Sequence, residues 1–426
     1  MCFLSLGRAG RYAASRPAAI PDLWEFGTLR PVGAVRVEAA IGDLERLCAA
    51  RLDHRQLQHE AAELFRRAVP FDVAVQASVD PASMIETSCV PIGIPPDSER
   101  ERHVMWLEYA SDDPLPYAEV ASRRSRAAAL RAEVQDVRQV RRFTEIGEPL
   151  GVFDELRAAF VADGLCWGTV TLYRTVAHPS FRDEEVAFFT SISATMARGL
   201  RGAFLRAAVD DVDHLADPPG HCTVSRSGDV ITTTEAAERW LDTLGSADRL
   251  PAVLAALAAQ LDAHAAPHAT VVGTAGPITL HAMPAKGVDD GAAAVIIEKP
   301  RPVHLTPLIM AAHGLTDRER DITELVLRGL VTKQIARQLE ITEYTVQDHL
   351  KSIFAKVGVG TRGELAYELY ARHYLPRTES GATPGPYGYY LGPRLLSPER
   401  GARDLADERS GRLTSHAKPG QPTSGV

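Results

Sequence analysis

The chain has few cysteines, and they are far apart. No two of them form a C-x-x-C pair, and their number is odd, which argues against a disulfide framework, a cysteine metal site or a redox dithiol. We expect them to be small buried residues in a reducing, cytoplasmic compartment. The 426-residue sequence contains Cys2, Cys48, Cys89, Cys166 and Cys222.

Long apolar runs are also missing. The longest stretch without Asp, Glu, Lys or Arg spans residues 263–285, but it contains prolines, glycines and histidines that would leave broken backbone and polar groups in lipid. At the N-terminus, Arg8 and Arg11 follow a short apolar start, whereas a secretory signal places its positive charge first. We therefore expect neither a membrane span nor secretion.

Motifs of common enzymes are absent from the sequence. It holds no Walker A sequence and no G-x-S-x-G elbow, and His59-Glu60-Ala61-Ala62-Glu63 lacks the second histidine of a zinc protease. The G-x-G-x-x-G pattern at 358–363 follows no expected strand, so it indicates a turn between helices rather than a dinucleotide site. We predict a protein that is not an enzyme, with no cofactor and no catalytic or metal-binding residues.

The length and the changes in composition predict several domains. We expect a multidomain protein with an α/β region of two domains followed by an all-α domain of four helices. Its segments are a disordered extension (1–35), a first α/β domain (36–208), a second α/β domain (218–300), a linker (301–314), the helical domain (315–376) and a disordered tail rich in Gly and Pro (377–426).

The first α/β segment mixes helical and strand patterns. Residues 54–69 have helical spacing, 71–80 alternate as a strand, 156–162 indicate a helix, and a strand follows the Asp163-Gly164 turn. A long helix from Asp183 to Ala208 then carries an apolar stripe suited to pairing with a second copy. This order resembles a GAF sensor domain, and the resemblance implies either small-molecule binding or association.

Seven arginines lie between Ser122 and Arg142. We interpret this segment as a charged, solvated surface, with a nucleic-acid contact as the alternative.

The second α/β segment predicts a strand, a turn at Ser227-Gly228-Asp229, a second strand and a helix, followed by a hairpin and a last apolar strand. It resembles a PAS-like fold, although Thr234 stands where that family often has Asn before its first helix. His221 and Cys222 are neighbours on a strand and should point to opposite faces, which argues against a shared metal or haem site.

Four consecutive helical patterns follow between residues 315 and 375. Thr316 precedes an acidic first turn that includes Glu319, and Thr332 and Thr342 are placed to cap the second and third helices. The third helix has an apolar face made of Val346, Leu350, Ile353, Phe354 and Val357. The opposite face carries Tyr344, Gln347, Asp348 and Lys351. Two short helices with a polar outer face on the second are typical of helix-turn-helix DNA-binding domains.

The residues from Leu315 to Val359 closely resemble the LuxR-type domain of bacterial transcription regulators. The matching residues include Glu319, Gly329, Lys333, Ile335, Ala336, Leu339, Thr345, Val346, His349 and Leu350. The resemblance implies a transcription regulator that binds double-stranded DNA as a homodimer and works with RNA polymerase.

The resemblance also assigns roles to single residues. The base-reading positions are Tyr344, Gln347, Asp348 and Lys351. Contacts to the DNA phosphates are expected from Thr332, Lys333, Thr345 and His349. Pairing through the fourth helix would use Leu365, Leu369 and Tyr370.

Charge gives this region little general attraction for DNA, because its nine basic residues are balanced by nine acidic ones between Leu315 and Leu375. Useful affinity therefore needs two copies on two half-sites. The alternative is a sensor and protein-interaction module, or a polymerase subunit of the sigma-factor type that uses a related fold. A sigma factor should also have an aromatic, basic melting segment, which this sequence does not show.

Overall fold

The computed structural model describes residues 34–95, 97–110, 113–209, 218–244, 252–261, 266–274, 276–288, 291–370, 372, 383–384 and 390–391. Residues 1–33 of the expected N-terminal extension lie outside this range. Most elements belong to one compact unit of residues 1–212 and 218–375, and residues 213–217 and 376–426 form a second. In the second unit, β11 (Thr383–Pro384) and β12 (Tyr390–Leu391) form a short antiparallel ladder, and the rest of the tail predicted at 377–426 lies outside the described residues.

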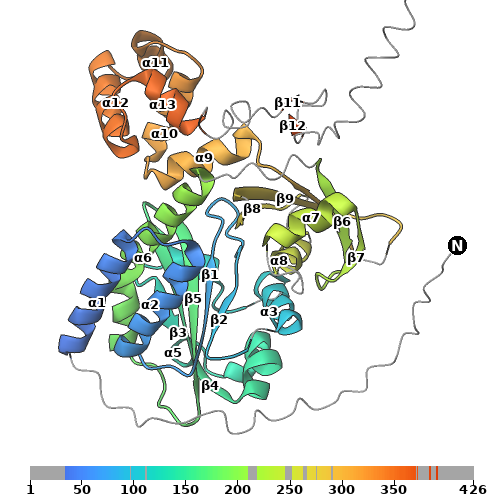
Figure 1. The fold of residues 1–426 in the computed structure, drawn as a ribbon. Coiled ribbons are helices and arrows are strands. Elements are labelled where there is room, and N and C mark those ends of the chain that lie inside the picture. The colour runs from blue at the N-terminus through green and yellow to red at the C-terminus, as the bar shows by residue number, and fades with distance from the viewer. Residues whose placement is uncertain are drawn as a thin grey trace, which may run out of the picture. The chain divides into compact units, whose positions relative to one another are not determined.

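The first α/β segment forms an antiparallel sheet with helices on its faces (Figure 1). Its elements are α1 (Ala34–Ala49), α2 (His54–Ala68), β1 (Val73–Ser78), β2 (Val90–Ile92), α3 (Ser98–Ala110), α4 (Tyr117–Ser122), β3 (Ala127–Ala129), α5 (Leu130–Glu133), η1 (Val137–Gln139), η2 (Phe143–Gly147), η3 (Glu148–Leu150), β4 (Val152–Ala162), β5 (Leu165–Thr175) and α6 (Asp183–Val209). The strands lie in the order β2-β1-β5-β4-β3.

Strand β4 corrects one prediction. Residues 156–162 were expected to be helical because Ala, Leu and Arg favour helices, but they form a strand paired with β5 along its whole length. Asp163 and Gly164 both have positive φ, which is the backbone of a tight hairpin turn, and this turn brings the two strands together. Pairing between strands therefore overrides the local helix propensity.

The two faces of β4 have opposite chemistry, as the alternation of a strand requires. Leu156, Ala158 and Phe160 belong to the apolar core shared with α1, α2 and α6. Glu155 and Arg157 face the other side and are almost fully buried there. The helices therefore cover one face with apolar side chains, while the other face buries charge.

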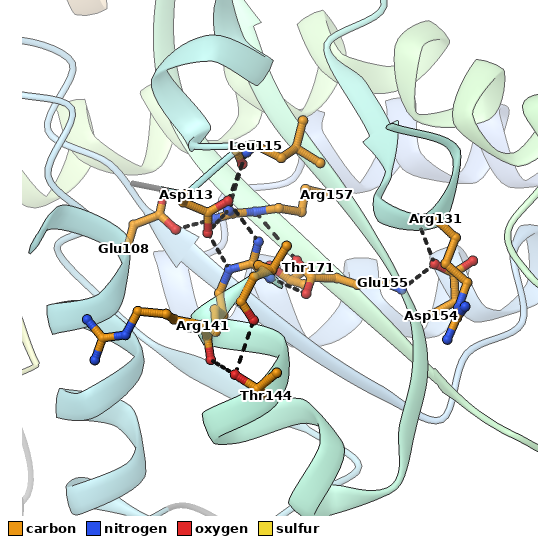
Figure 2. Close-up of polar contacts among 12 residues, drawn as sticks. Glu108, Asp113, Leu115, Arg131, Arg141, Thr144, Asp154, Glu155, Arg157 and Thr171 are labelled. Carbon is orange, nitrogen blue, oxygen red and sulfur yellow. Dashed lines mark hydrogen bonds and ion pairs between the residues drawn. The ribbon is translucent and has the colours of Figure 1, made fainter. Parts of the chain in front are cut away.

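A cluster of charged side chains occupies part of that second face (Figure 2), beside a smaller apolar cluster that includes Ala159 and Val161. Arg157 pairs with Glu108 and donates to the backbone oxygen of Leu115 over 2.7 Å, and Arg142 pairs with Asp113 over 2.9 Å and with Glu155. All five charged side chains are at most 5% exposed. Arg142 is thus an exception to the predicted solvated surface, whereas Arg124, Arg131, Arg138 and Arg141 are exposed as expected. We call these five residues the buried charge cluster: Glu108, Asp113, Arg142, Glu155 and Arg157.

The long helix α6 is confirmed, but its apolar stripe has another partner than expected. Phe189, Ile192, Met196 and Leu200 are at most 1% exposed and pack into the core beneath the sheet. The stripe is therefore not free to pair with a second copy. An amphipathic pattern shows that a helix has an apolar face, not which surface covers it.

The second α/β segment forms another antiparallel sheet. Its elements are β6 (Gly220–Val224), β7 (Val230–Thr233), α7 (Glu235–Leu244), α8 (Val253–Gln260), β8 (His268–Gly273), β9 (Gly276–Pro284) and β10 (Ala293–Glu298). The order β7-β6-β10-β9-β8 repeats that of the first sheet, with the second, first, fifth, fourth and third strands side by side. The expected strands and helix are confirmed, and α8 is an additional helix that is apolar except for its last residue, Gln260.

Single residues of this sheet behave as their positions predict. On β6, His221 is exposed and Cys222 is buried, so the two do not share a site. Thr234 accepts a hydrogen bond from the backbone N–H of Ala237 and from that of His221, which fastens the start of α7 to β6.

The C-terminal segment is helical. Its elements are α9 (Pro302–Ala312), α10 (Asp317–Leu327), α11 (Thr332–Gln338), α12 (Glu343–Val357) and α13 (Arg362–Leu369). Helix α9 contacts both α10 and α13, so the expected linker is mostly a helix packed on the domain that follows. Among the described residues, no helix combines the length and apolar character needed to cross a membrane.

Candidate DNA-binding interface

The interface is built on helix α10. Thr316 accepts a hydrogen bond from the backbone N–H of Glu319, and the Glu319 carboxylate accepts one from the backbone N–H of Thr316, which forms a capping box. Ile322, Leu325 and Val326 then bury the apolar face of the helix, as predicted. Gly329 follows with φ of +83°, which ends the helix.

Glu319 also connects α10 to α12. Its carboxylate accepts hydrogen bonds from Ser352 over 2.6 Å and from the Lys356 ammonium over 2.7 Å. Burial alone would raise the pKa of Glu319, but the hydrogen bonds from Lys356, Ser352 and Thr316 outweigh it and lower the pKa to about 2. The Lys356 ammonium donates in addition to the backbone oxygen of Gly314. One ionised carboxylate therefore sets the position of α12 relative to α10.

Helix α11 and the short turn after it lead into α12. Thr332 is the first residue of α11 and not its cap, because the capping position belongs to Val331, whose N–H donates to the Gln334 side chain. The hydroxyl of Thr332 instead accepts from the Arg362 guanidinium over 2.9 Å. Glu340 takes the left-handed conformation, with φ of +55°, in the turn between α11 and α12.

Helix α12 has the two faces that the sequence predicts. Thr342 caps it by accepting from the backbone N–H of Thr345, and Gly358 ends it with φ of +81°. The buried residues on its inner face are Val346, Leu350, Ile353 and Val357, with Phe354 half-buried. The outer face is exposed and carries Tyr344, Gln347, Asp348 and Lys351.

These outer residues form one polar surface. Tyr344 is 70% exposed. Lys351 is 75% exposed, and its ammonium lies 3.1 Å from the Asp348 carboxylate. Asp348 therefore partly neutralises and orients Lys351, an arrangement that the spacing of three residues on a helix allows. We call Tyr344, Gln347, Asp348 and Lys351 the α12 reading face.

The expected phosphate-contacting residues lie on α11 and the first half of α12. Lys333 is exposed at the start of α11, whereas Thr332, Thr345 and His349 are half-buried. The hydroxyls of Thr345 and Thr342 are 2.8 Å apart. Lys333 is thus the most exposed of the four side chains, and the Thr332 hydroxyl already accepts a hydrogen bond from Arg362.

The expected pairing residues of α13 do not form a common surface. Leu365 and Leu369 are fully buried in the core of their own chain. Tyr370 is 46% exposed, directly after the end of the helix. The helix therefore offers Tyr370 and the neighbouring Tyr367, also about half exposed, rather than the two leucines, as its outer apolar surface.

Comparison with known proteins finds matches in the segment that contains α10–α13. Residues 313–369 match the family described as "Bacterial regulatory proteins, luxR family". The spore germination protein GerE of Bacillus subtilis (strain 168) is 42% identical over 55 residues, which make up 13% of this chain and 74% of GerE. The chain belongs to the luxR family of bacterial regulatory proteins.

Other luxR relatives are larger and match through the same part only. The nitrate/nitrite response regulator protein NarL of Escherichia coli (strain K12) is 50% identical over 52 residues, which cover 12% of this chain and 24% of NarL. The monoamine regulon transcriptional regulator of Klebsiella aerogenes is 43% identical over 65 residues, covering 15% and 27%. The chain thus spans about a quarter of these two relatives. The luxR likeness concerns α10–α13 and leaves the two sheets unassigned.

Sequence reasoning missed the bonds that hold the interface together. Arg362 donates to the backbone oxygen of Leu330 and to Thr332, and Arg318 donates to the backbone oxygen of Leu339. Both arginines thus fasten the two ends of α11. Charge alone did not distinguish them from arginines on the surface.

Proposed function

We propose that this chain is a sequence-specific DNA-binding transcription regulator that acts as a dimer. The observation that carries the proposal is the α12 reading face, a polar surface held outward by a helix whose other side is fully buried. In a helix-turn-helix domain the second helix enters the major groove with its outer face toward the bases. The relatives named as regulators match in this part of the chain.

Each member of the reading face offers chemistry that can distinguish bases. The Lys351 ammonium can donate to guanine O6 or N7, Gln347 can pair with adenine, and the Asp348 carboxylate can accept from cytosine N4. Tyr344 lies at the start of the same face. Lys333 and the hydroxyl groups at Thr332 and Thr345 support contacts to phosphates, which set the register of the protein on DNA.

We further propose that the two sheets are sensor units, GAF-like and then PAS-like, that control DNA binding and contact with RNA polymerase. Their repeated strand order and their lack of recognisable catalytic motifs support this role. At the first sheet, a cavity beside Val73, Val75 and Tyr173 has a volume of only about 60 Å³. Ligand pockets are typically several times larger, so this cavity would have to widen to hold a small-molecule ligand.

The DNA-binding proposal is tested by selecting bound duplexes from a random pool with the full-length protein at several salt concentrations. Enrichment of one motif, with an affinity at least about 1,000-fold above that for random duplex, is expected. Recovery of no motif at any salt concentration contradicts the proposal, whereas a retained motif with lost transcriptional output contradicts only the polymerase part.

The control proposal needs a second comparison. Full-length protein and a fragment limited to residues 300–376 are measured on the selected duplex, with and without cell extract. We expect the affinity or the stoichiometry of the full-length protein, and not of the fragment, to respond to the extract. Equal affinity, stoichiometry and transcriptional output of the two proteins in every condition removes the regulatory role of the sheets.

A further inference from the structure

Three histidines from three different elements lie against one another in the second sheet. His268 on β8 and His281 on β9 are direct cross-strand partners, with ring centroids 5.9 Å apart. His304, in the first turns of α9, lies 5.1 Å from His281 and 5.7 Å from His268, measured between ring centroids. The three imidazoles therefore form a triangle between the sheet and the helix, which we call the histidine triangle.

The size of the triangle matches that of a three-histidine metal centre. Zn²⁺ binds an imidazole nitrogen at about 2.0–2.1 Å, so the ring centroid lies about 3.2 Å from the ion. Tetrahedral angles then place neighbouring ring centroids about 5.2 Å apart. The three separations of 5.1, 5.7 and 5.9 Å are at or slightly above that value.

Two nitrogens of the triangle lack the partners that buried polar atoms normally have. His281 Nε2 and His304 Nδ1 are shielded from solvent, and neither makes a hydrogen bond in the described part of the chain. Burial lowers the pKa of both imidazoles, and the neighbouring histidines lower it further. The neutral form of an imidazole is the one that binds metal ions.

A carboxylate stands beside the triangle. Glu298, the last residue of β10, places Oε1 3.6 Å from His281 Nε2 and 3.2 Å from Arg301 Nε. A fourth ligand from Glu298 would complete a tetrahedral set and offset part of the charge of a divalent ion. The neighbouring Arg301 is largely exposed, so the carboxylate can turn from the guanidinium toward the rings.

In the conformation that the structure describes, no group of three or more His, Cys, Asp or Glu side chains is arranged to hold a metal ion, so the triangle has to rearrange to bind one. Closure requires the rings to turn about the Cβ–Cγ bond, a torsion that is broad and soft for histidine and re-aims the ring nitrogens, and to shift slightly about the Cα–Cβ bond, which moves the ring centroids. A shortening of the two longer centroid separations by less than about 1 Å is sufficient.

We propose that His268, His281 and His304, with Glu298 as the fourth ligand, bind one divalent transition-metal ion of the Zn²⁺ type. Imidazole nitrogen with one carboxylate oxygen suits Zn²⁺ and its neighbours in the first transition row, and not Mg²⁺ or Ca²⁺. The ion fastens the start of α9 to β8 and β9. Because α9 also contacts α10 and α13, an ion that fixes the position of α9 also restrains these two helices of the luxR domain.

Zinc binding is measured directly on the full-length protein after removal of metals with a chelator. Isothermal titration with Zn²⁺ alone, in the absence of DNA, should show one saturable site. His281→Gln should weaken this site by at least about 100-fold, and Glu298→Gln by about 10–100-fold. The matched control is His59→Gln, because His59 is an exposed histidine on α2 and should leave the affinity unchanged.

Two further readouts separate metal ligation from loss of folding. Circular dichroism should show the same helix content for the His281→Gln and His304→Gln variants as for the wild type. Co²⁺ in place of Zn²⁺ should give the intense visible absorption of a tetrahedral centre in the wild type, and not in either variant. Mg²⁺ should not compete.

The absence of saturable Zn²⁺ binding, or equal binding by wild type and His281→Gln, overturns the proposal. The affinity for the selected duplex, measured with and without Zn²⁺, is a separate readout that rests on the proposed function. If Zn²⁺ binds as expected but does not change the affinity for the selected duplex, the metal site stands and its control of α12 is excluded. Loss of DNA binding in all proteins, with Zn²⁺ binding intact, contradicts only the proposed function.

Discussion

Replacing Glu319 with glutamine should loosen the helical domain that presents the α12 reading face. The change keeps the size of the side chain and removes its charge. In the wild type the carboxylate is almost fully buried and accepts from Ser352, Lys356 and Thr316. Glutamine can still accept hydrogen bonds, but it does not attract the Lys356 ammonium as an ion and its amide group adds two donors.

The size of the effect follows from the pKa. Lowering the pKa of Glu319 from 4.5 to about 2 corresponds to about 3 kcal/mol in favour of the ionised, folded state. Lys356 is 34% exposed, so water replaces part of the lost interaction, and we expect a loss of about 2 kcal/mol. This stability is fully present above pH 4.5 in the wild type and is lost as the pH falls from about 4.5 toward 2.

Hydrogen exchange followed by mass spectrometry resolves this region within the full chain. At neutral pH the amides of α10 and α12 should open about 30-fold more often in Glu319→Gln than in the wild type. The control Glu324→Gln changes an exposed glutamate of the same helix and should alter exchange by less than about 2-fold. Equal protection in wild type and Glu319→Gln would refute the role given to this carboxylate.

Four other substitutions test three separate parts of the account. Lys351→Ala should weaken binding to the selected duplex by about 1–3 kcal/mol and relax the base preference at one position. Lys333→Ala should weaken binding to all duplexes alike and reduce the slope of log affinity against log salt concentration by about one. Competition binding measures both effects. Gly358→Ala should cost about 1–2 kcal/mol in denaturant unfolding, because φ is +81° and the space around the glycine is open, so only backbone strain acts. Arg157→Met should lower the free energy of unfolding by about 3–5 kcal/mol, because it leaves buried carboxylates unpaired. Arg138→Met changes an exposed arginine and is the control. Equal losses in the two variants would contradict the stabilising role of the buried charge cluster.

The helical domain could be predicted from sequence because its signals are local. Thr316 and Thr342 are side-chain caps that act within three residues, and Gly329 and Gly358 end helices through their own backbone conformation. The burial of Val346 and the exposure of Lys351 follow from helical periodicity alone. Thr332 was assigned wrongly as a cap because its true partner, Arg362, is 30 residues away.

The first sheet shows what local signals cannot supply. The composition of residues 156–162 favours a helix, and only pairing with β5 makes them a strand. Arg142 is indistinguishable from its exposed neighbours in sequence, because the burial of a charge depends on Asp113 and Glu155 arriving from other elements. The histidine triangle was missed for the same reason, since its members are 13 and 23 residues apart along the chain.

The most direct measurement of the central claim is footprinting of full-length protein on the selected duplex. The account predicts two protected half-sites about one helical turn, or 10–10.5 base pairs, apart from centre to centre, or a multiple of this spacing. Protection should weaken steeply with salt, and Lys351→Ala should lose it at protein concentrations that saturate the wild type. A single unpaired half-site contradicts dimeric binding, and no protection at any salt concentration contradicts DNA binding through α12.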